Sequence, residues 1–165
     1  MGNVKQKVIT ISLILILLLS ISASSVAAAP EGTKEADVVK HAKSWIGVKN
    51  VHGGNSRSGI DCSHLVYQVY LKAGAKGISF MKVPAMKKNK YYAVIKSPRP
   101  GDLIFWKKDI TYNGRKYYLT SHVGILIGGG KFVHTSSDKG KVVIDSISTA
   151  PYKSGQYYYV RWIKK

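Results

Sequence analysis

The amino-acid sequence predicts an α+β fold, in which N-terminal helices pack on an antiparallel β-sheet of about five to six strands. Apolar residues recur at helical spacing in the segments before residue 75. After Pro100 the pattern changes to short apolar runs separated by turn-forming residues, which are typical of strands. Helices followed by consecutive strands favour a layer of helices on an antiparallel sheet.

Residues 1–29 form a separate segment. Two lysines precede an apolar run over Val8–Ile21, and small residues follow over Ala23–Ala29. This order is typical of a secretory signal peptide. The alternative is an uncleaved membrane anchor, but the apolar run is short for the roughly 20 residues that a span requires. We therefore predict a signal peptide over 1–29, a single domain over 30–165, and a secreted, periplasmic or cell-wall-associated protein.

The predicted mature chain is strongly basic. The whole chain has 26 basic and 8 acidic residues, and removal of the two lysines in the first segment leaves a net charge of +16. Such a charge favours an anionic partner, which outside the cell means acidic wall polymers or a lipid surface. Solubility alone explains the charge equally well, because no long block of Lys and Arg marks a site. We expect a monomer with no nucleic-acid partner.

The first predicted helix begins near Thr33, a suitable N-cap residue, and ends at Gly47. Its apolar face consists of Val38, Val39, Ala42, Trp45 and Ile46.

A glycine-rich loop over 48–60 leads to the second helix, which begins after the N-cap Asp61 and ends at Gly74. Its buried face consists of Leu65, Val66, Val69, Tyr70 and Ala73. A short helix is expected near 83–90, within a basic segment that contains several prolines.

The second half of the chain reads as strands. Asn113-Gly114 is a strong signal for a hairpin, and Gly128–Gly130 predicts a turn that folds one strand back on the next. The expected strands span 102–106, 110–112, 115–119, 121–127, 131–135, 141–145 and 157–163.

Cys62 is the single cysteine, so no internal disulfide forms. It opens the second helix, where unpaired N–H groups and the helix dipole favour negative charge. A thiol in this place is expected to have a lowered pKa and to act as a nucleophile, and the same N–H groups can hold an oxyanion. The alternative is a small buried apolar residue.

A cysteine nucleophile also requires a base. His122 begins an apolar strand, and the following turn can place His134 of the next strand beside it. His134 would then orient the imidazole of His122 through its second ring nitrogen. Either histidine alone reads more naturally as a half-buried polar residue, but their fit with Cys62 favours a catalytic set.

Four sequence blocks resemble the NlpC/P60 family of cell-wall cysteine peptidases. Asp61-Cys62-Ser63-His64-Leu65-Val66 is similar to the Asp-Cys-Ser-Gly-Leu-Val block of that family. The others are Pro100-Gly101-Asp102-Leu103, His122-Val123-Gly124-Ile125 and Phe132-Val133-His134. They arrive in the order of the family and cover roughly residues 36 to 136.

The resemblance implies a papain-like NlpC/P60 fold over 30–165 and peptidoglycan stem peptides as substrate, often cut between D-γ-glutamate and a diamino acid. It implies Cys62 as nucleophile, His122 as base and His134 as orienting residue, with no cofactor. Asp61 and Ser63 occupy the places that bind a free N-terminal amine in some members, although helix capping is an equally good role for Asp61.

Three features depart from the family pattern. His64 replaces the usual Gly and is expected to narrow the groove or to add a substrate contact. Together with Cys62 it offers two metal-type ligands, which are too few to propose zinc. Asn50 stands where many members carry a Tyr that contacts substrate. The hairpin around Asn113-Gly114 looks like an insertion.

The function expected from the sequence is therefore a secreted stem-peptide endopeptidase. An amidase with the same Cys/His centre is a close alternative, and a lipid acyl hydrolase with that centre is a more distant one. A basic cell-surface binding protein with weak or lost catalysis belongs to another class and would predict decay of the Cys/His set, whose members are all present.

Overall fold

The computed structural model describes residues 35–119 and 121–163 of the chain. The predicted signal peptide and the predicted cap Thr33 lie outside the described residues. Within the described ranges, no helix is long and apolar enough to cross a bilayer.

Within the described residues, the three α-helices lie between residues 35 and 86, close to where the sequence predicts them. α2 spans Glu35–Lys43, α3 spans Cys62–Lys72 and α4 spans Val83–Met86. Acidic residues lie in the first turn of α2 and basic residues in its last turn, which suits the helix dipole. A short 3₁₀ helix, η1, spans Tyr152–Ser154 near the C-terminus.

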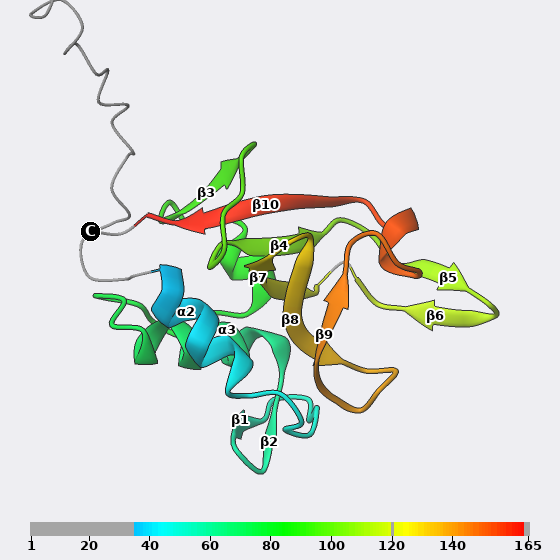
Figure 1. Cartoon of the computed structure of the whole chain (residues 1–165), viewed down its shortest axis with the longest axis horizontal. Coiled ribbons are helices and arrows are strands. Elements are labelled where there is room, and N and C mark those ends of the chain that lie inside the picture. The colour runs from blue at the N-terminus through cyan, green and yellow to red at the C-terminus, as the bar shows by residue number, and fades with distance from the viewer. Residues whose placement is uncertain (1–34, 120, 164–165) are drawn as a thin grey trace, which may run out of the picture.

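The strands form one large sheet and two small ones. The large sheet has the order β3-β10-β4-β7-β8-β9, and every neighbouring pair is antiparallel (Figure 1). Its strands are β3 (Tyr92–Ile95), β4 (Leu103–Trp106), β7 (Val123–Gly128), β8 (Lys131–Ser136), β9 (Lys141–Ser146) and β10 (Tyr157–Trp162). The expected α+β fold with five to six strands is confirmed.

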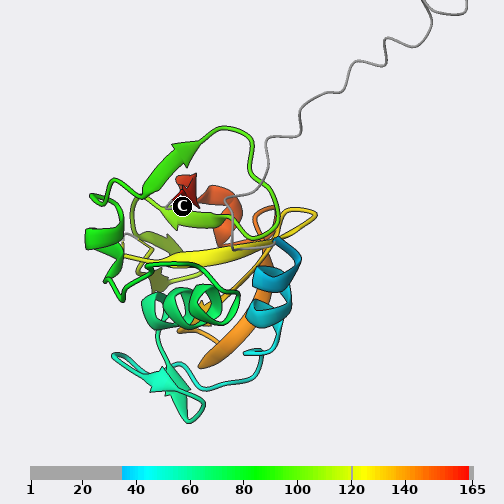
Figure 2. The same cartoon turned by 90° about the vertical axis from the view of Figure 1, so that its left-hand side faces the viewer.

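The helices α2 and α3 gather on one face of this sheet, where they contact β7, and α3 also contacts β8 (Figure 2). A hydrophobic core joins the buried sides of both helices to the strands, with Leu65, Val66 and Val69 fully buried. A smaller apolar cluster includes Trp106, Phe132 and Tyr152. Both faces of the central strands are therefore covered.

The Pro-Gly-Asp segment before β4 is a structural anchor. Gly101 adopts a positive φ of 91° that favours glycine, and its carbonyl accepts a 2.5 Å hydrogen bond from the Tyr70 hydroxyl of α3. The buried carboxylate of Asp102 accepts two 2.7 Å bonds from the Arg161 guanidinium of β10 and one of the same length from the Arg99 N–H. These bonds tie α3, β4 and β10 together.

The structure adds elements that the sequence did not predict. A small hairpin, β1 (Asn55–Ser56) and β2 (Gly59–Ile60), lies inside the expected loop over 48–60. β3 was also not expected. The hairpin around Asn113-Gly114 is confirmed as β5 (Ile110–Tyr112) and β6 (Arg115–Tyr117), which pair only with each other. His122 precedes β7 by one residue instead of beginning the strand.

Candidate active site

Asp61 fixes the start of α3 and the loop beside it. Its carboxylate accepts 2.8 Å hydrogen bonds from the His64 N–H and the Ser63 hydroxyl, and a 3.1 Å bond from the Gly53 N–H. Burial raises the pKa of Asp61, but the bonds from His64 and Ser63 more than offset it, so the pKa lies below its usual value. Asp61 is thus an ionised N-cap, and the capping role expected for it is confirmed.

Cys62 is the first residue of α3, and its thiol lies against the chain just before β7. Sγ donates to the Ser121 carbonyl oxygen at 3.8 Å. Burial, and secondarily the charge of Asp61, raises the pKa of Cys62 to about 11, although the N–H groups of Val123 and Ser63 favour the thiolate. The expectation of a lowered thiol pKa is wrong, because the loss of hydration outweighs the helix N-terminus. The resting thiol is neutral.

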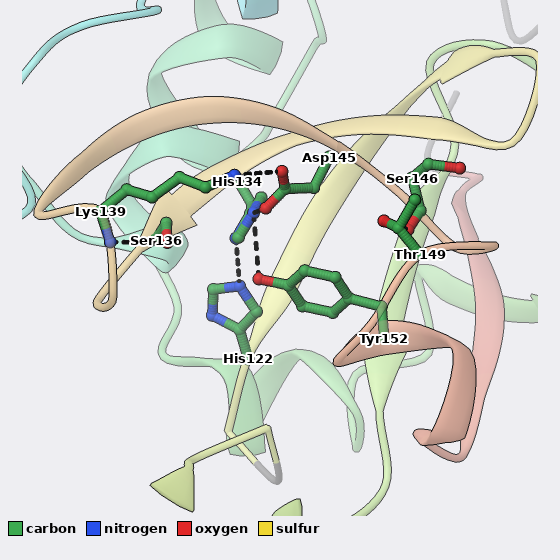
Figure 3. A network of polar contacts seen from close by, with 8 residues as sticks. All are labelled: His122, His134, Ser136, Lys139, Asp145, Ser146, Thr149 and Tyr152. Atoms are coloured by element: carbon green, nitrogen blue, oxygen red, sulfur yellow. Dashed lines mark hydrogen bonds and ion pairs between the residues drawn. The ribbon is translucent and has the colours of Figure 1, made fainter. Parts of the chain in front are cut away.

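His122 and His134 face each other, as predicted from the turn between their strands. His122 Nε2 lies 2.8 Å from His134 Nδ1, and the two rings are almost perpendicular at 82° (Figure 3). Burial, together with the charge that His134 would carry, holds the pKa of His122 well below 6.5. Burial also lowers the pKa of His134, although Asp145 acts in the opposite direction. Both imidazoles are therefore neutral at neutral pH.

The polar chain continues beyond the predicted residues. His134 Nε2 lies 3.1 Å from Asp145 Oδ2 on β9 and 3.3 Å from the Tyr152 hydroxyl of η1 (Figure 3). The second carboxylate oxygen of Asp145 accepts a 2.5 Å bond from Lys139 Nζ. Asp145 and Tyr152 were missed from the sequence. The register of β8 and β9 sets Asp145 across from Phe132, and no local sequence signal reveals that pairing.

Most of the predicted site residues line one groove of about 600 Å³. It runs between the start of α3, the segment before α4 and the chain that leads into β7. Six of its lining residues were predicted: Asn50, Asp61, Cys62, Ser63, His64 and His122. His134 does not line this groove. It is fully buried behind His122, as an orienting residue requires.

His64 forms part of the groove wall. Its ring stacks on Phe80 with centroids 3.9 Å apart and an interplanar angle of 9°. Its Nδ1 lies 3.1 Å from Asp61 Oδ2. His64 and Phe80 both line the groove, so this flat aromatic pair forms part of its wall. Within the described part of the chain, no group of three or more His, Cys, Asp and Glu side chains is placed to hold a metal ion.

A thiol at the start of α3 that lines one groove with His122, which is itself bonded to His134, has the features of a cysteine hydrolase. The sequence profile of the NlpC/P60 family matches residues 47–161. The chain belongs to this family of cysteine peptidases.

Relatives of known name support the assignment. The chain is 28% identical to a gamma-DL-glutamyl hydrolase of Bacillus subtilis, across 99% of this chain and 38% of that protein. It is 33% identical to murein DD-endopeptidase MepS/murein LD-carboxypeptidase of Escherichia coli, across 71% of this chain and 56% of that protein. It thus spans about half or less of either relative.

A solved structure gives the same picture. The NlpC/p60 domain of the peptidoglycan hydrolase SagA superposes with a TM-score of 0.56 at 28% identity. The match covers 76% of this chain and 97% of that domain.

Proposed function

We propose that this protein is a secreted cysteine endopeptidase that hydrolyses peptidoglycan stem peptides. The observation that carries the proposal is the convergence of Cys62 and His122 on one groove, with His134 bonded behind His122. The peptidoglycan substrate is supported by the names of the E. coli relative and of SagA.

The protonation states define the first chemical step. Because the thiol and the imidazole are both neutral at rest, His122 takes the thiol proton as Sγ of Cys62 attacks the amide carbonyl carbon. Negative charge then develops on the carbonyl oxygen. The N–H groups at the start of α3 are suited to hold that oxyanion.

The remaining steps return the proton. Protonated His122 gives its proton to the amide nitrogen, the C–N bond breaks, and the amine leaves while the acyl group stays on sulfur as a thioester. Water then attacks the thioester and loses a proton to His122. The C–S bond breaks, and the sulfur recovers its proton from His122.

The bond that we propose is the one between D-γ-glutamate and a diamino acid. The likeness to a gamma-DL-glutamyl hydrolase supports it. The E. coli relative is named as a DD-endopeptidase, so cleavage of the cross-link is the competing outcome.

Four groove residues are proposed to contact the substrate. Asp61 is an ionised carboxylate at the groove and suits a free N-terminal amine, with Ser63 fixing its orientation. His64 provides a flat surface, and Asn50 offers a side-chain amide at the groove.

The test is a digest of purified peptidoglycan, read by mass spectrometry of the soluble fragments. The protein should release new fragments that end at D-γ-glutamate, and Cys62→Ala should release none. New ends at the glycan–peptide amide would instead indicate an amidase. An unchanged profile on several wall types, with binding to the wall retained, would favour the binding protein. Activity on lipid esters alone would favour the acyl hydrolase.

We also propose that the basic surface holds the enzyme on anionic wall polymers. A second groove, of about 460 Å³, is lined by three basic residues, His41, Arg57 and Lys72. Its other lining residues are neutral: Ser44, Trp45, Asn55, Ser56 and Gln68. A groove with cationic and neutral hydrogen-bonding groups and no carboxylate among its lining residues complements a phosphodiester chain.

Retention on teichoic acid tests this partner. The Arg57→Ala/Lys72→Ala variant should elute from immobilised teichoic acid at a lower salt concentration than the wild-type protein, because fewer counterions are released on binding. Lys88→Ala/Lys96→Ala removes the same charge outside this groove and serves as the matched control. Equal elution of the two variants would show only diffuse charge attraction. Tighter binding to phosphatidylglycerol vesicles would point to the lipid surface instead.

A further inference from the structure

Asp145 ends a chain of polar contacts that begins at His122. Its carboxylate is bonded by His134 Nε2 on one oxygen and by Lys139 Nζ on the other (Figure 3). The side chain is 14% exposed, and Lys139 closes its solvent side. Burial raises the pKa of Asp145, but the bonds to His134 and Lys139 outweigh it, so the carboxylate is ionised.

The positions of these atoms leave one consistent arrangement of protons. An ionised carboxylate accepts hydrogen bonds only, so His134 carries its proton on Nε2 and offers a lone pair on Nδ1. That lone pair lies 2.8 Å from His122 Nε2, which therefore carries the proton of His122. The remaining nitrogen of His122, Nδ1, is then unprotonated and is the one available to take the proton of Cys62.

We propose that Asp145, oriented by Lys139, is a positioning residue that fixes the tautomers of His134 and His122 and so makes His122 a base. The inference rests on the proposed thiol chemistry and does not depend on which bond of peptidoglycan is cut. A neutral His134 with no fixed partner would exchange between its two tautomers, and only one of them leaves Nδ1 of His122 free.

Tyr152 does not replace this function. Its hydroxyl, 3.3 Å from His134 Nε2, both donates and accepts hydrogen bonds, so it is compatible with either tautomer. Burial raises the pKa of Tyr152 far above its usual value, so the hydroxyl stays protonated. Among the side chains that hydrogen-bond His134, only the Asp145 carboxylate is restricted to accepting, so it dictates where the proton sits.

Lys139 makes the proposal testable with near-isosteric variants. In Asp145→Asn, the amide oxygen should stay with the Lys139 ammonium, which cannot accept a bond. The amide NH₂ then faces His134 Nε2 and forces the proton of His134 onto Nδ1. His134 Nδ1–H then donates a hydrogen bond to His122 Nε2, which must be unprotonated to accept it. The proton of His122 therefore moves to Nδ1, and this nitrogen can no longer take the proton of Cys62.

The expected order of rates separates positioning from packing. Asp145→Asn should slow the reaction on the order of 100-fold, the size of a lost base. Asp145→Ala should lose less, although it removes more atoms, because no group then imposes the wrong tautomer. Adding Lys139→Met to Asp145→Asn frees the Asn amide to turn its oxygen toward His134. The double variant should therefore react at least about ten-fold faster than Asp145→Asn alone. Lys141→Met removes an exposed charge on β9, the strand that carries Asp145. Combined with Asp145→Asn, it should give no recovery of the rate.

Two readouts need no peptidoglycan, so failure of this proposal is distinguishable from failure of the proposed function. The ¹⁵N shifts of the histidine rings report which nitrogen carries the proton. In Asp145→Asn, the shifts of His134 should show the proton on Nδ1 instead of Nε2. In Asp145→Asn combined with Lys139→Met, they should return to the wild-type pattern. Alkylation of Cys62 by iodoacetamide near pH 7 should follow the same order, and thermal unfolding verifies that each variant is folded.

The proposal is overturned if folded Asp145→Asn keeps the wild-type tautomers, or if Asp145→Ala is slower than Asp145→Asn. It is also overturned if Lys139→Met and Lys141→Met, each combined with Asp145→Asn, change the reaction rate by the same factor. If the variants show the predicted ¹⁵N shifts and the predicted order of alkylation rates, but the wild-type protein cleaves no wall, the peptidoglycan substrate is rejected and the tautomer assignment is retained.

Discussion

Alanine at Gly124 tests whether the packing of β7 on β8 holds the histidine pair in place. A Cβ at this position would lie 2.9 Å from Cδ2 of Phe132, and 3.3 Å from both Ile104 Cγ2 and the Val133 carbonyl oxygen. Carbon atoms are best packed at about 3.5 Å or more, so the Phe132 ring must withdraw by about 0.6 Å. The ring has little freedom to do so, because it is fully buried.

The direction of that strain leads to the active site. The Phe132 ring contacts Trp106, Tyr152 and His134, with centroids 5.0, 5.1 and 4.9 Å away. We expect Gly124→Ala to lower the free energy of unfolding by about 1–3 kcal/mol, as overpacking does. We also expect about a ten-fold loss of rate, since a displacement near 1 Å at a catalytic group costs up to about 100-fold.

Urea denaturation and Cys62 alkylation measure the two effects. Phe132→Leu should cost about 1–2 kcal/mol alone, through a cavity. In combination with Gly124→Ala it relieves the overlap, so the double variant should be more stable than additivity predicts by on the order of 1 kcal/mol. Strictly additive losses, or a Gly124→Ala protein as stable as the wild type, would refute the packing argument.

Three further outcomes follow from the same structure. Arg161→Met should lower the free energy of unfolding by about 3 kcal/mol in urea denaturation, because the buried carboxylate of Asp102 loses its charged partner and keeps only the bond from the Arg99 N–H. Thermal stability should fall as the pH is lowered from about 6.5. The buried His122 and His134 have lowered pKa values, so the unfolded chain binds more protons than the folded one in that range. Phe80→Ala should raise KM more than it lowers kcat for a soluble stem peptide, because it removes only a wall of the groove.

Each of these has a clear contrary result. A loss under about 1 kcal/mol in Arg161→Met would mean that water or another residue satisfies Asp102. Constant stability down to pH 4.5 would contradict neutral buried imidazoles, since aspartates titrate below that range. A selective fall in kcat for Phe80→Ala would move that ring from binding to the chemical step.

Local patterns were sufficient to predict the fold class, the two main helices and most central strands. The periodic apolar faces of α2 and α3 are local properties, and so are the glycine turns that set the order of β7 and β8. The family blocks placed Cys62, His122 and His134, and the structure brings the two histidines into contact.

The missed features depend on distant partners. β3 is an edge strand whose Val94 is largely exposed, and its partner β10 lies more than sixty residues further along the chain. Its own residues, Tyr-Ala-Val-Ile, include strand formers, but the run is short and lies in a basic, proline-containing segment. Asp145 looks like any acidic residue at the end of a strand until the register of β8 and β9 places it behind His134. The high thiol pKa comes from burial, which no local pattern reveals.

The most direct test of the account is to capture the acyl group on sulfur. The protein is mixed with purified stem peptide, quenched in acid after short times and digested for peptide mass spectrometry. We predict that the peptide containing Cys62 gains the mass of the acyl fragment ending at D-γ-glutamate, and that the adduct disappears as product accumulates. Fragment release by Cys62→Ala at the wild-type rate, or an adduct on any other residue, would contradict catalysis by this thiol.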